Sequence, residues 1–214
     1  RENESDRAFF VCWESYSGEG VSIEAAKIVS AGNIMRKTLF PPRGPAIRYL
    51  YPGVSASGGE VLLSAVEIRN VISQGGVIDQ SNTIVSAVVE PEHMEIVQDS
   101  RPAVLNHGLL ADIEAGSGVW GYLGPRRRVR FLSEGTLYWE RKKVHDGFTP
   151  AKEGRGVLCL SHFDGEKREW GKELILHRGS YEYRLQKDGD RYWVLHRPVD
   201  QTGSQGLVLE CLSG

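Results

Sequence analysis

The chain has 214 residues, of which 40% are hydrophobic and 25% are charged, a composition typical of a globular protein with a buried core. Its formal net charge of −2 gives no overall field that favours nucleic acid or a membrane surface as a partner. The sequence shows neither a signal peptide nor an apolar run of about 18 residues, so we expect no membrane span and a cytoplasmic protein.

Three cysteines, Cys12, Cys159 and Cys211, lie among apolar neighbours in the sequence. An odd number without a C-x-x-C pair excludes a closed disulfide framework and a cysteine-based zinc site. We therefore interpret each cysteine as a small buried side chain of a protein in a reducing compartment.

The first elements are predicted to be a strand and a helix. After a polar lead-in, the segment RAFFVCWE (7–14) is typical of a β-strand. The segment SIEAAKIVSAGNIMRKTLF (22–40) predicts a helix that begins at Ser22 as N-cap and ends before PPRGP (41–45). The apolar face of this helix is formed by Ala25, Ile28, Val29 and Gly32.

A second helix is predicted for residues 59–76, GEVLLSAVEIRNVISQGG, which end on two glycines. Its apolar residues at helical spacing are Val61, Ala65, Ile68 and Ile72. The β-branched content of the segment also suits a strand, so that alternative stays open. Two strands are predicted to follow, NTIVSAVVE (82–90) and HMEIVQ (93–98).

The C-terminal half is expected to be antiparallel β-structure, because turn signals recur in it at short, regular intervals. Residues 173–197 predict a three-strand meander with two-residue turns at Arg178-Gly179 and at Asp188-Gly189. This arrangement gathers the leucines and tyrosines of the segment on one apolar face. Further strands are predicted at 118–123, 127–132, 136–144, 156–163 and 206–212.

These elements predict an α+β fold that is predominantly β. Residues 1–107 would form a mixed part of helices and strands, and residues 108–214 an antiparallel β-sandwich or barrel. The two parts are either separate domains or one continuous domain. The segment QDSRPAVLNHG (98–108) is the best candidate for a boundary between them.

The segment GPRRRVRFLSEGTLYWERKKV (124–144) combines seven basic residues with interleaved aromatic residues. Surfaces that bind single-stranded RNA or DNA have this character, because cations contact phosphates and rings stack on bases. We predict a patch that binds nucleic acid or another anion. Its residues would be Arg126, Arg127, Arg141, Lys142, Lys143 and Trp120.

The register of this basic hairpin decides how many of its charges are available to a ligand. A two-residue loop places like charges opposite each other, which is destabilising. A three-residue loop, 133–135, with its glycine in the left-handed conformation pairs Phe131 with Leu137 and Arg128 with Glu140. We prefer the second register, in which the remaining basic residues gather at the open end of the hairpin.

An enzymatic alternative depends on Cys12. The Cys12-Trp13 pair resembles the Cys-Trp of some viral papain-like proteases, which implies a cysteine nucleophile with His93 or His107 as a distant partner. Cys12 lies inside a predicted strand without an adjacent histidine, so the sequence shows no source of thiolate activation. The segment KVHDGF (143–148) is similar to a segment of viral cap-binding domains, which implies an aromatic sandwich for a base.

No metal site and no cofactor are expected. None of the six histidines forms an H-x-x-x-H, H-E-x-x-H or mixed Cys/His cluster. In the predicted meander, His177 and His196 point to opposite faces and cannot share a metal. Glycine-rich phosphate loops and the G-x-S-x-G nucleophile motif are also absent from the sequence.

The lack of a catalytic motif favours a non-enzymatic function. We expect a recognition or structural module of a larger polypeptide, since the first residue is Arg1, and the two short resemblances suggest a viral one. Its β-rich half would bind a protein partner or the parent polypeptide. The alternatives are a single-stranded RNA- or DNA-binding domain that uses the basic hairpin, and a cysteine hydrolase that uses Cys12.

Overall fold

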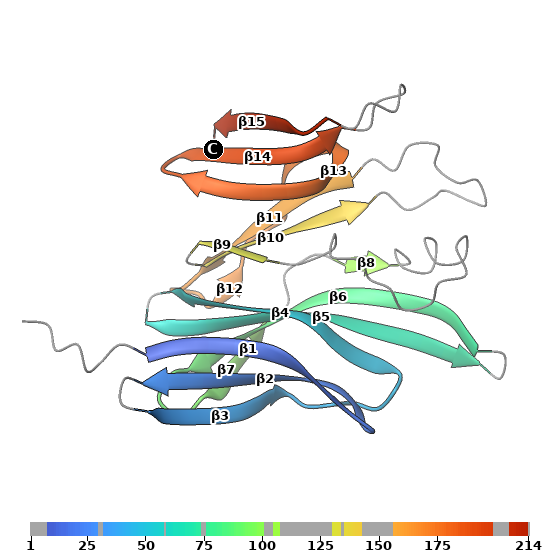
Figure 1. Cartoon of the computed structure of the whole chain (residues 1–214), viewed down its shortest axis with the longest axis vertical. Helices are drawn as coiled ribbons and strands as arrows, with labels where there is room; N and C mark the ends of the chain where they lie inside the picture. Colours follow the sequence, from blue (N-terminus) through green and yellow to red (C-terminus); the bar gives the residue numbers. More distant parts are fainter. Residues whose placement is uncertain are drawn as a thin grey trace, which may run out of the picture.

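The structure is a computed structural model, in which every regular element of the described residues is a β-strand. The described residues are 8–29, 32–57, 59–73, 76–100, 105–107, 130–133, 135–142, 156–198 and 206–213. Their strands pair antiparallel in three sheets, which Figure 1 shows stacked along the long axis of the molecule. These residues include no helix that is long and apolar enough to cross a membrane.

The first sheet contains β1 (Ala8–Ser17), β2 (Gly20–Val29) and β3 (Asn33–Phe40) in chain order. The strand predicted for 7–14 is confirmed, but the helix predicted for 22–40 is wrong, because these residues form most of β2 and all of β3. Gly32 has a φ of +80° and thus suits the turn between the two strands. Alternate residues of β2, such as Ile23 and Ala25, enter the core, so strand packing overrides the local helix propensity.

The second sheet contains β4 (Ile47–Ser57), β5 (Glu60–Ser73), β6 (Gly76–Glu90) and β7 (Glu95–Ser100) in chain order, and β8 (Leu105–His107) pairs with β6. The strands predicted for 82–90 and 93–98 are confirmed. The helix predicted for 59–76 is wrong, and the strand alternative that stayed open for this segment is confirmed by β5. Adjacent residues of β5 are buried on opposite faces, since Leu62 and Leu63 belong to different core clusters. A strand buried on both faces lacks polar alternation, so its sequence does not show the period of two.

The third sheet is formed by the C-terminal half. Its strands are β9 (Arg130–Ser133), β10 (Thr136–Lys142), β11 (Gly156–Asp164), β12 (Glu169–Trp170), β13 (Leu174–Asp188), β14 (Arg191–Pro198) and β15 (Val208–Ser213). The order is β15-β14-β13-β11-β10-β9, and β12 pairs with β11. The strands predicted near 127–132, 136–144, 156–163 and 206–212 are confirmed, and 118–123 lies outside the described residues.

A hairpin exists at one of the two predicted turns of the meander, but its position is wrong by one residue. The two-residue turn is at Gly189-Asp190, so Leu185 is opposite Val194. The turn predicted at Arg178-Gly179 is wrong, because β13 continues through both residues. The first half of β13 pairs with β11 and the second half with β14, and the ladder with β11 skips Gly179. A bulge therefore stands where a turn was predicted.

The basic hairpin of β9 and β10 has the predicted register beyond its loop, where Phe131 is opposite Leu137. Gly135 has a φ of +64° as expected, but Ser133 pairs with Thr136 and a bulge follows this pair, so the predicted three-residue loop is wrong. Trp139 is buried against the second sheet, while Tyr138 on the other face belongs to another core cluster. Both faces of β10 are thus buried, and the predicted ion pair between Arg128 and Glu140 involves side chains outside the described residues.

The second sheet is the middle layer of the molecule. One of its faces packs on the first sheet and the other packs on β9, β10 and β11. The core clusters against the first sheet include Ile23, Phe40, Tyr49 and Leu63, and those against the third sheet include Leu62, Ile84, Trp139 and Cys159. The predicted division at residue 107 stays a prediction, because residues 108–129 are not described.

The third sheet curls on its other face. Side chains from β10, β11, β13 and β14 meet there in one cluster, with Tyr138, Leu158, Tyr183 and Val194 among its buried members. β9 and β13 contact each other although β10 and β11 lie between them in the sheet. As a result, residues far apart on a flat sheet face one another across the concave side.

Candidate functional site

A cleft of about 560 Å³ opens where β1, β4 and β9 come together. It is lined by Glu14, Tyr51, Pro52, Gly53, Val54, Arg130 and Phe131. Each of the three strands is the terminal strand of its sheet. The cleft therefore brings together strand edges that the described ladders leave unpaired, and such edges can accept a further strand.

Glu14 organises one wall of the cleft. Its carboxylate accepts a hydrogen bond from the backbone N–H of Tyr51 at 2.7 Å and another from the hydroxyl of Tyr16 at 2.5 Å. Tyr51 has a φ of +56°, a left-handed conformation that is uncommon for tyrosine, at the irregularity of β4. The bond to Glu14 raises the pKa of Tyr16 to about 12. Glu14 thus holds a strained segment in place, and strained segments often occur at functional sites.

Arg130 and Phe131 of β9 line the cleft from the third sheet. A Cβ atom on Gly53 would lie only 3.3 Å from a ring carbon of Phe131, so the glycine permits close packing of the ring on β4. The ion pairs between described residues do not include Arg130. The cleft therefore combines an aromatic surface with a guanidinium that has no described carboxylate partner.

The predicted basic patch is only partly within the described residues. Arg126, Arg127, Lys143 and Trp120 lie outside them, and Arg141 and Lys142 lie in β10 without described side chains. The patch therefore stays a prediction. Arg130 of the same hairpin, which lines the cleft, was not among the predicted patch residues. The Pro52-Gly53 pair is the one sequence signal for the cleft, because these residues are typical of turns and irregular strands.

Cys12 lies in β1, opposite Ala25 of β2, and its side chain packs against the core between the first and second sheets. Burial raises the pKa of its thiol to about 11, which is the opposite of the activation that a nucleophile needs. Of the two suggested partners, His93 bonds to Glu90 and the side chain of His107 is not described. These features weigh against the hydrolase hypothesis, which remains without support.

Three titratable side chains meet on the concave face of the third sheet: His177 of β13, His196 of β14 and Glu210 of β15. The two imidazole centroids are 4.4 Å apart. The prediction that these histidines point to opposite faces is wrong. β13 continues through Gly179 without a turn, and two register irregularities lie between His177 and Tyr183. The 3.1 Å contact between these two side chains places them on the same face.

The contacts of this histidine cluster are short. His177 Nε2 lies 3.2 Å from Glu210 Oε2, and His196 Nε2 lies 3.3 Å from Glu210 Oε1. His177 Nδ1 lies 3.1 Å from the Tyr183 hydroxyl. Burial, followed by the proximity of His196, lowers the pKa of His177, so its neutral form is favoured. The side chain of His196 is 4% exposed, and neither of its ring nitrogens has a hydrogen-bond partner among the described residues.

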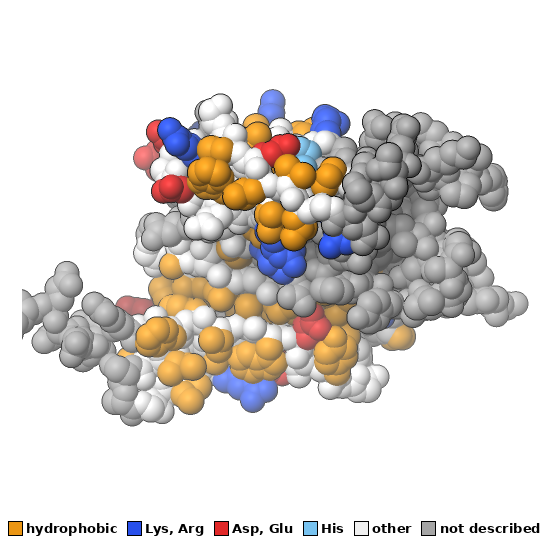
Figure 2. Space-filling model, turned by 45° about the horizontal axis from the view of Figure 1, so that its top comes forward, with side chains coloured by type: hydrophobic (Ala, Val, Ile, Leu, Met, Phe, Trp, Pro, Cys, Tyr) orange, Lys and Arg blue, Asp and Glu red, His pale blue; other side chains and the backbone are white. Residues whose placement is uncertain are grey.

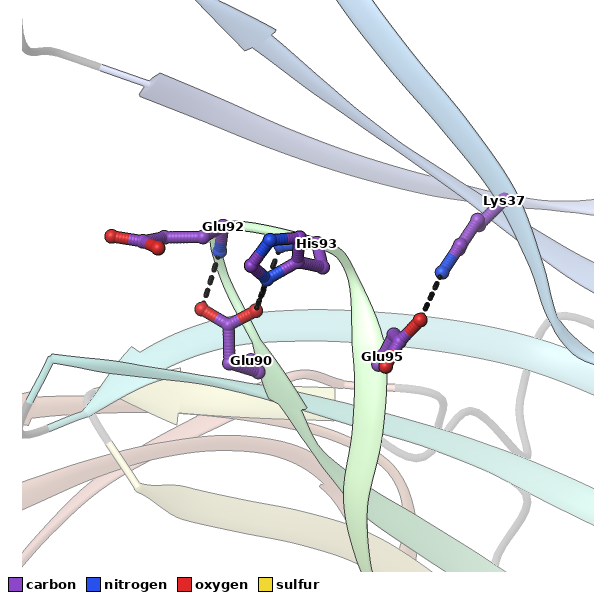
Figure 3. A network of polar contacts seen from close by, with 5 residues as sticks. All are labelled: Lys37, Glu90, Glu92, His93 and Glu95. Carbon is purple, nitrogen blue, oxygen red and sulfur yellow. Dashed lines mark hydrogen bonds and ion pairs between the residues drawn. The ribbon is translucent and has the colours of Figure 1, made fainter.

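A second group of carboxylates and histidine lies in the turn between β6 and β7 (Figure 3). The Glu90 carboxylate accepts hydrogen bonds from the backbone N–H groups of Glu92 and His93 and contacts the His93 ring at 3.0 Å. These bonds lower the pKa of Glu90. Figure 3 shows the Glu92 carboxylate pointing away from this group. The group is thus explained as a turn whose donors are already satisfied.

The outer face of the first sheet carries exposed apolar side chains, which gather on the lower part of Figure 2. Phe9 and Ile34 are 66% and 61% exposed, and both are in the row of Ile28 on the central strand. Farther along the sheet, the Arg36 guanidinium lies 4.9 Å from the Trp13 ring. Exposed apolar faces of this kind are typical of contact surfaces, although the described residues do not indicate an occupant.

No protein-family model matches the sequence, and no curated protein matches it. Among solved structures, the chain is similar to a Trypanosoma rangeli sialidase in complex with sialic acid, with 10% identity and a TM-score of 0.50 over 98% of this chain and 34% of the sialidase. A β-fructofuranosidase of Microbacterium saccharophilum follows with 10% identity and a TM-score of 0.45 over 89% of this chain and 48% of the enzyme. The chain thus spans about a third of the sialidase, and at this identity the likeness supports an antiparallel β-fold and nothing about activity.

Proposed function

We propose that the chain is a recognition module that binds an extended, acidic segment of a partner protein in the cleft between β1, β4 and β9. The cleft itself carries this proposal, because it unites the Arg130 guanidinium, the rings of Tyr51 and Phe131, and three strand edges. Extended peptides bind in this way, with backbone bonds to a sheet edge and side chains in flanking pockets.

The charges of the cleft define the chemistry of the bound segment. Glu14 already accepts two hydrogen bonds, so its carboxylate is committed to Tyr51 and Tyr16. Arg130 has no described ion-pair partner and can form a two-pronged bond to a carboxylate. An aspartate or glutamate beside an apolar residue would meet both Arg130 and the ring of Phe131.

Single-stranded nucleic acid is the competing ligand, since Arg130 beside Phe131 also suits a phosphate next to a stacked base. The carboxylate of Glu14 in the same cleft disfavours a continuous row of phosphates more than a peptide that places a single carboxylate at Arg130. Short strand edges also give a peptide backbone partners that a nucleic acid lacks. We therefore propose the peptide as ligand and treat the nucleic acid as an outcome of the test.

The test is selection of a random peptide library on the immobilised chain, followed by fluorescence anisotropy with the enriched peptides. We expect enriched sequences that pair an acidic with an apolar residue, and binding at least tenfold weaker to the Arg130→Glu variant. The matched control is Arg191→Glu, a charge reversal at an exposed arginine of β14, which should leave binding unchanged.

Three results would overturn the proposal. No enrichment, or equal binding to wild-type chain and Arg130→Glu, removes the cleft as a peptide site. Binding of a fluorescent oligothymidine that weakens steeply with salt and is lost in Arg130→Glu would replace the peptide by nucleic acid. Thermal unfolding of each variant shows whether the substitution has simply destabilised the fold.

A further inference from the structure

We propose that His177, His196 and Glu210 form a binding site for a divalent transition metal ion, with Zn²⁺ as the natural probe. The three residues come from the consecutive strands β13, β14 and β15. They lie on the concave face of the third sheet, away from the cleft of the proposed function. Two imidazoles and one carboxylate are a ligand set that proteins use for zinc.

The distances between the donor atoms match this metal. Nitrogen and oxygen ligands at about 2.0–2.1 Å from a tetrahedral zinc ion are about 3.3–3.4 Å from each other. Here the two carboxylate oxygens of Glu210 each face one imidazole, Oε2 at 3.2 Å from His177 Nε2 and Oε1 at 3.3 Å from His196 Nε2. All three donor atoms lie within 4.8 Å of one another, so one ion can reach them with small side-chain movements.

His196 provides an independent indication of a missing partner. Its side chain is only 4% exposed, and neither ring nitrogen has a hydrogen bond among the described residues, although Nε2 lies 3.3 Å from Glu210 Oε1. Buried polar atoms are nearly always hydrogen-bonded, so this imidazole beside two further ligands requires an explanation. Coordination of an ion through Nε2 supplies one.

Tyr183 orients the second imidazole. When the Nδ1–H of His177 donates to the Tyr183 hydroxyl at 3.1 Å, the Nε2 lone pair points to Glu210. A ligand histidine commonly donates its other N–H in this manner, which fixes the ring and its tautomer.

The Glu90, Glu92 and His93 group provides the contrast within the same chain. It offers the same kinds of donor atoms at similar separations. However, Glu90 already accepts hydrogen bonds from two backbone N–H groups, and the side chain of His93 is 73% exposed. No buried donor there lacks a partner. The comparison assigns the metal site to the third sheet and predicts that the turn binds no ion tightly.

Binding would have a structural consequence. β15 is the terminal strand of its sheet and pairs only with β14 among the described strands. An ion held by Glu210 of β15 and by His177 of β13 would connect β15 to a strand that it does not pair with. Zinc should therefore stabilise the chain by mass action and slow amide exchange chiefly in β15.

The experiment is calorimetric titration of Zn²⁺ into the untagged, metal-free full chain at neutral pH, repeated with Co²⁺ while the absorption spectrum is recorded. We expect one ion per chain and intense visible Co²⁺ bands that report tetrahedral coordination. Glu210→Gln and His177→Gln should each weaken Zn²⁺ binding at least a hundredfold. Glu90→Gln, the same change in the turn, should leave affinity and stoichiometry unchanged.

The proposal fails if the wild-type chain binds no stoichiometric Zn²⁺, or if Glu210→Gln binds as tightly as wild type. It also fails if Glu90→Gln loses the ion instead, because the site would then lie in the turn. Circular dichroism of the metal-free variants shows that they are folded, and Glu210 and His177 are tested separately so that one unstable variant does not decide the result.

Discussion

At the scale of single residues, Glu67 shows how the middle sheet accommodates a buried carboxylate. Its side chain is 2% exposed, it lies 2.6 Å from Arg69 Nε, and it faces the Tyr49 hydroxyl on the neighbouring strand. Burial and the nearby Glu67 charge raise the pKa of Tyr49. A buried charge is tolerated only with such partners, so the pairing explains an acidic residue within the core.

Replacement of this carboxylate tests the pairing. We expect Glu67→Ala to lower the free energy of unfolding by about 1–3 kcal/mol, because the buried Tyr49 hydroxyl loses its acceptor. Arg69→Ala should also destabilise the fold by at least about 1–3 kcal/mol, because it leaves the 2% exposed Glu67 carboxylate without its cation. Urea denaturation measures both variants, and an Arg69→Ala variant as stable as the wild-type chain would contradict the account.

Two half-buried histidines predict a dependence of stability on pH. Burial lowers the pKa of both His162 and His177 below the usual 6.5. Their unfolded forms therefore bind protons more readily than the folded ones, so stability is complete above pH 6.5 and falls as the pH decreases below it.

We expect the unfolding midpoint in urea, measured with EDTA present, to decrease from neutral pH to about pH 5. His162→Gln and His177→Gln should each reduce this decrease, while Lys172→Gln, a control at an exposed site, should not. A midpoint that rises on acidification over the same interval would show that these histidines are not held in their neutral form.

At the scale of elements, the sequence predicts hairpins well where one face is apolar and a glycine marks the loop. The β9–β10 hairpin is of this kind, since Phe131, Leu137 and Gly135 define its register. Prediction from the sequence fails for β5, because Leu62 and Leu63 are buried on opposite faces and remove the alternation that marks a strand. It also fails at Gly179, because a glycine suits a bulge as well as a turn.

The error at Gly179 also hid the histidine cluster from the sequence. With a turn at Gly179, His177 and His196 are separated, and only the continuous β13 brings them together. The cleft could not be predicted from the sequence either, because it combines Glu14, Tyr51 and Arg130 from three sheets. No local sequence pattern encodes how these sheets pack. Local propensity therefore predicted strands and loops, whereas the site follows from tertiary packing.

The contact between β4 and β9 can be tested through Gly53. A Cβ atom there would lie 3.1 Å from Ser64 Oγ and 3.3 Å from the Phe131 ring, so Gly53→Ala should destabilise the fold by about 1–3 kcal/mol. Gly165→Ala is the matched control, because a Cβ on Gly165 meets no atom within 4 Å. A variant Gly53→Ala as stable as Gly165→Ala would show that Phe131 does not pack on β4.

At the scale of the whole molecule, the middle sheet joins the two halves of the sequence. Its two faces pack on the first and third sheets, so both interfaces contribute to one core system. We expect Leu62→Ala and Leu63→Ala to lower the free energy of unfolding by about 2–5 kcal/mol each, because both side chains are buried. In a strand with one solvent-exposed face, only one of two adjacent substitutions would have so large an effect. Denaturation curves in which only one substitution destabilises would contradict a sheet buried on both faces.

Amide hydrogen exchange tests most directly whether the cleft between β1, β4 and β9 is the ligand-binding surface. With a saturating acidic peptide selected on the wild-type chain, we predict slower exchange in residues 14–16, 51–54 and 130–133, which line or adjoin the cleft. Exchange in β13–β15 should be unchanged by the peptide. Protection confined to β13–β15, or to the outer face of β1–β3, would contradict recognition at the cleft.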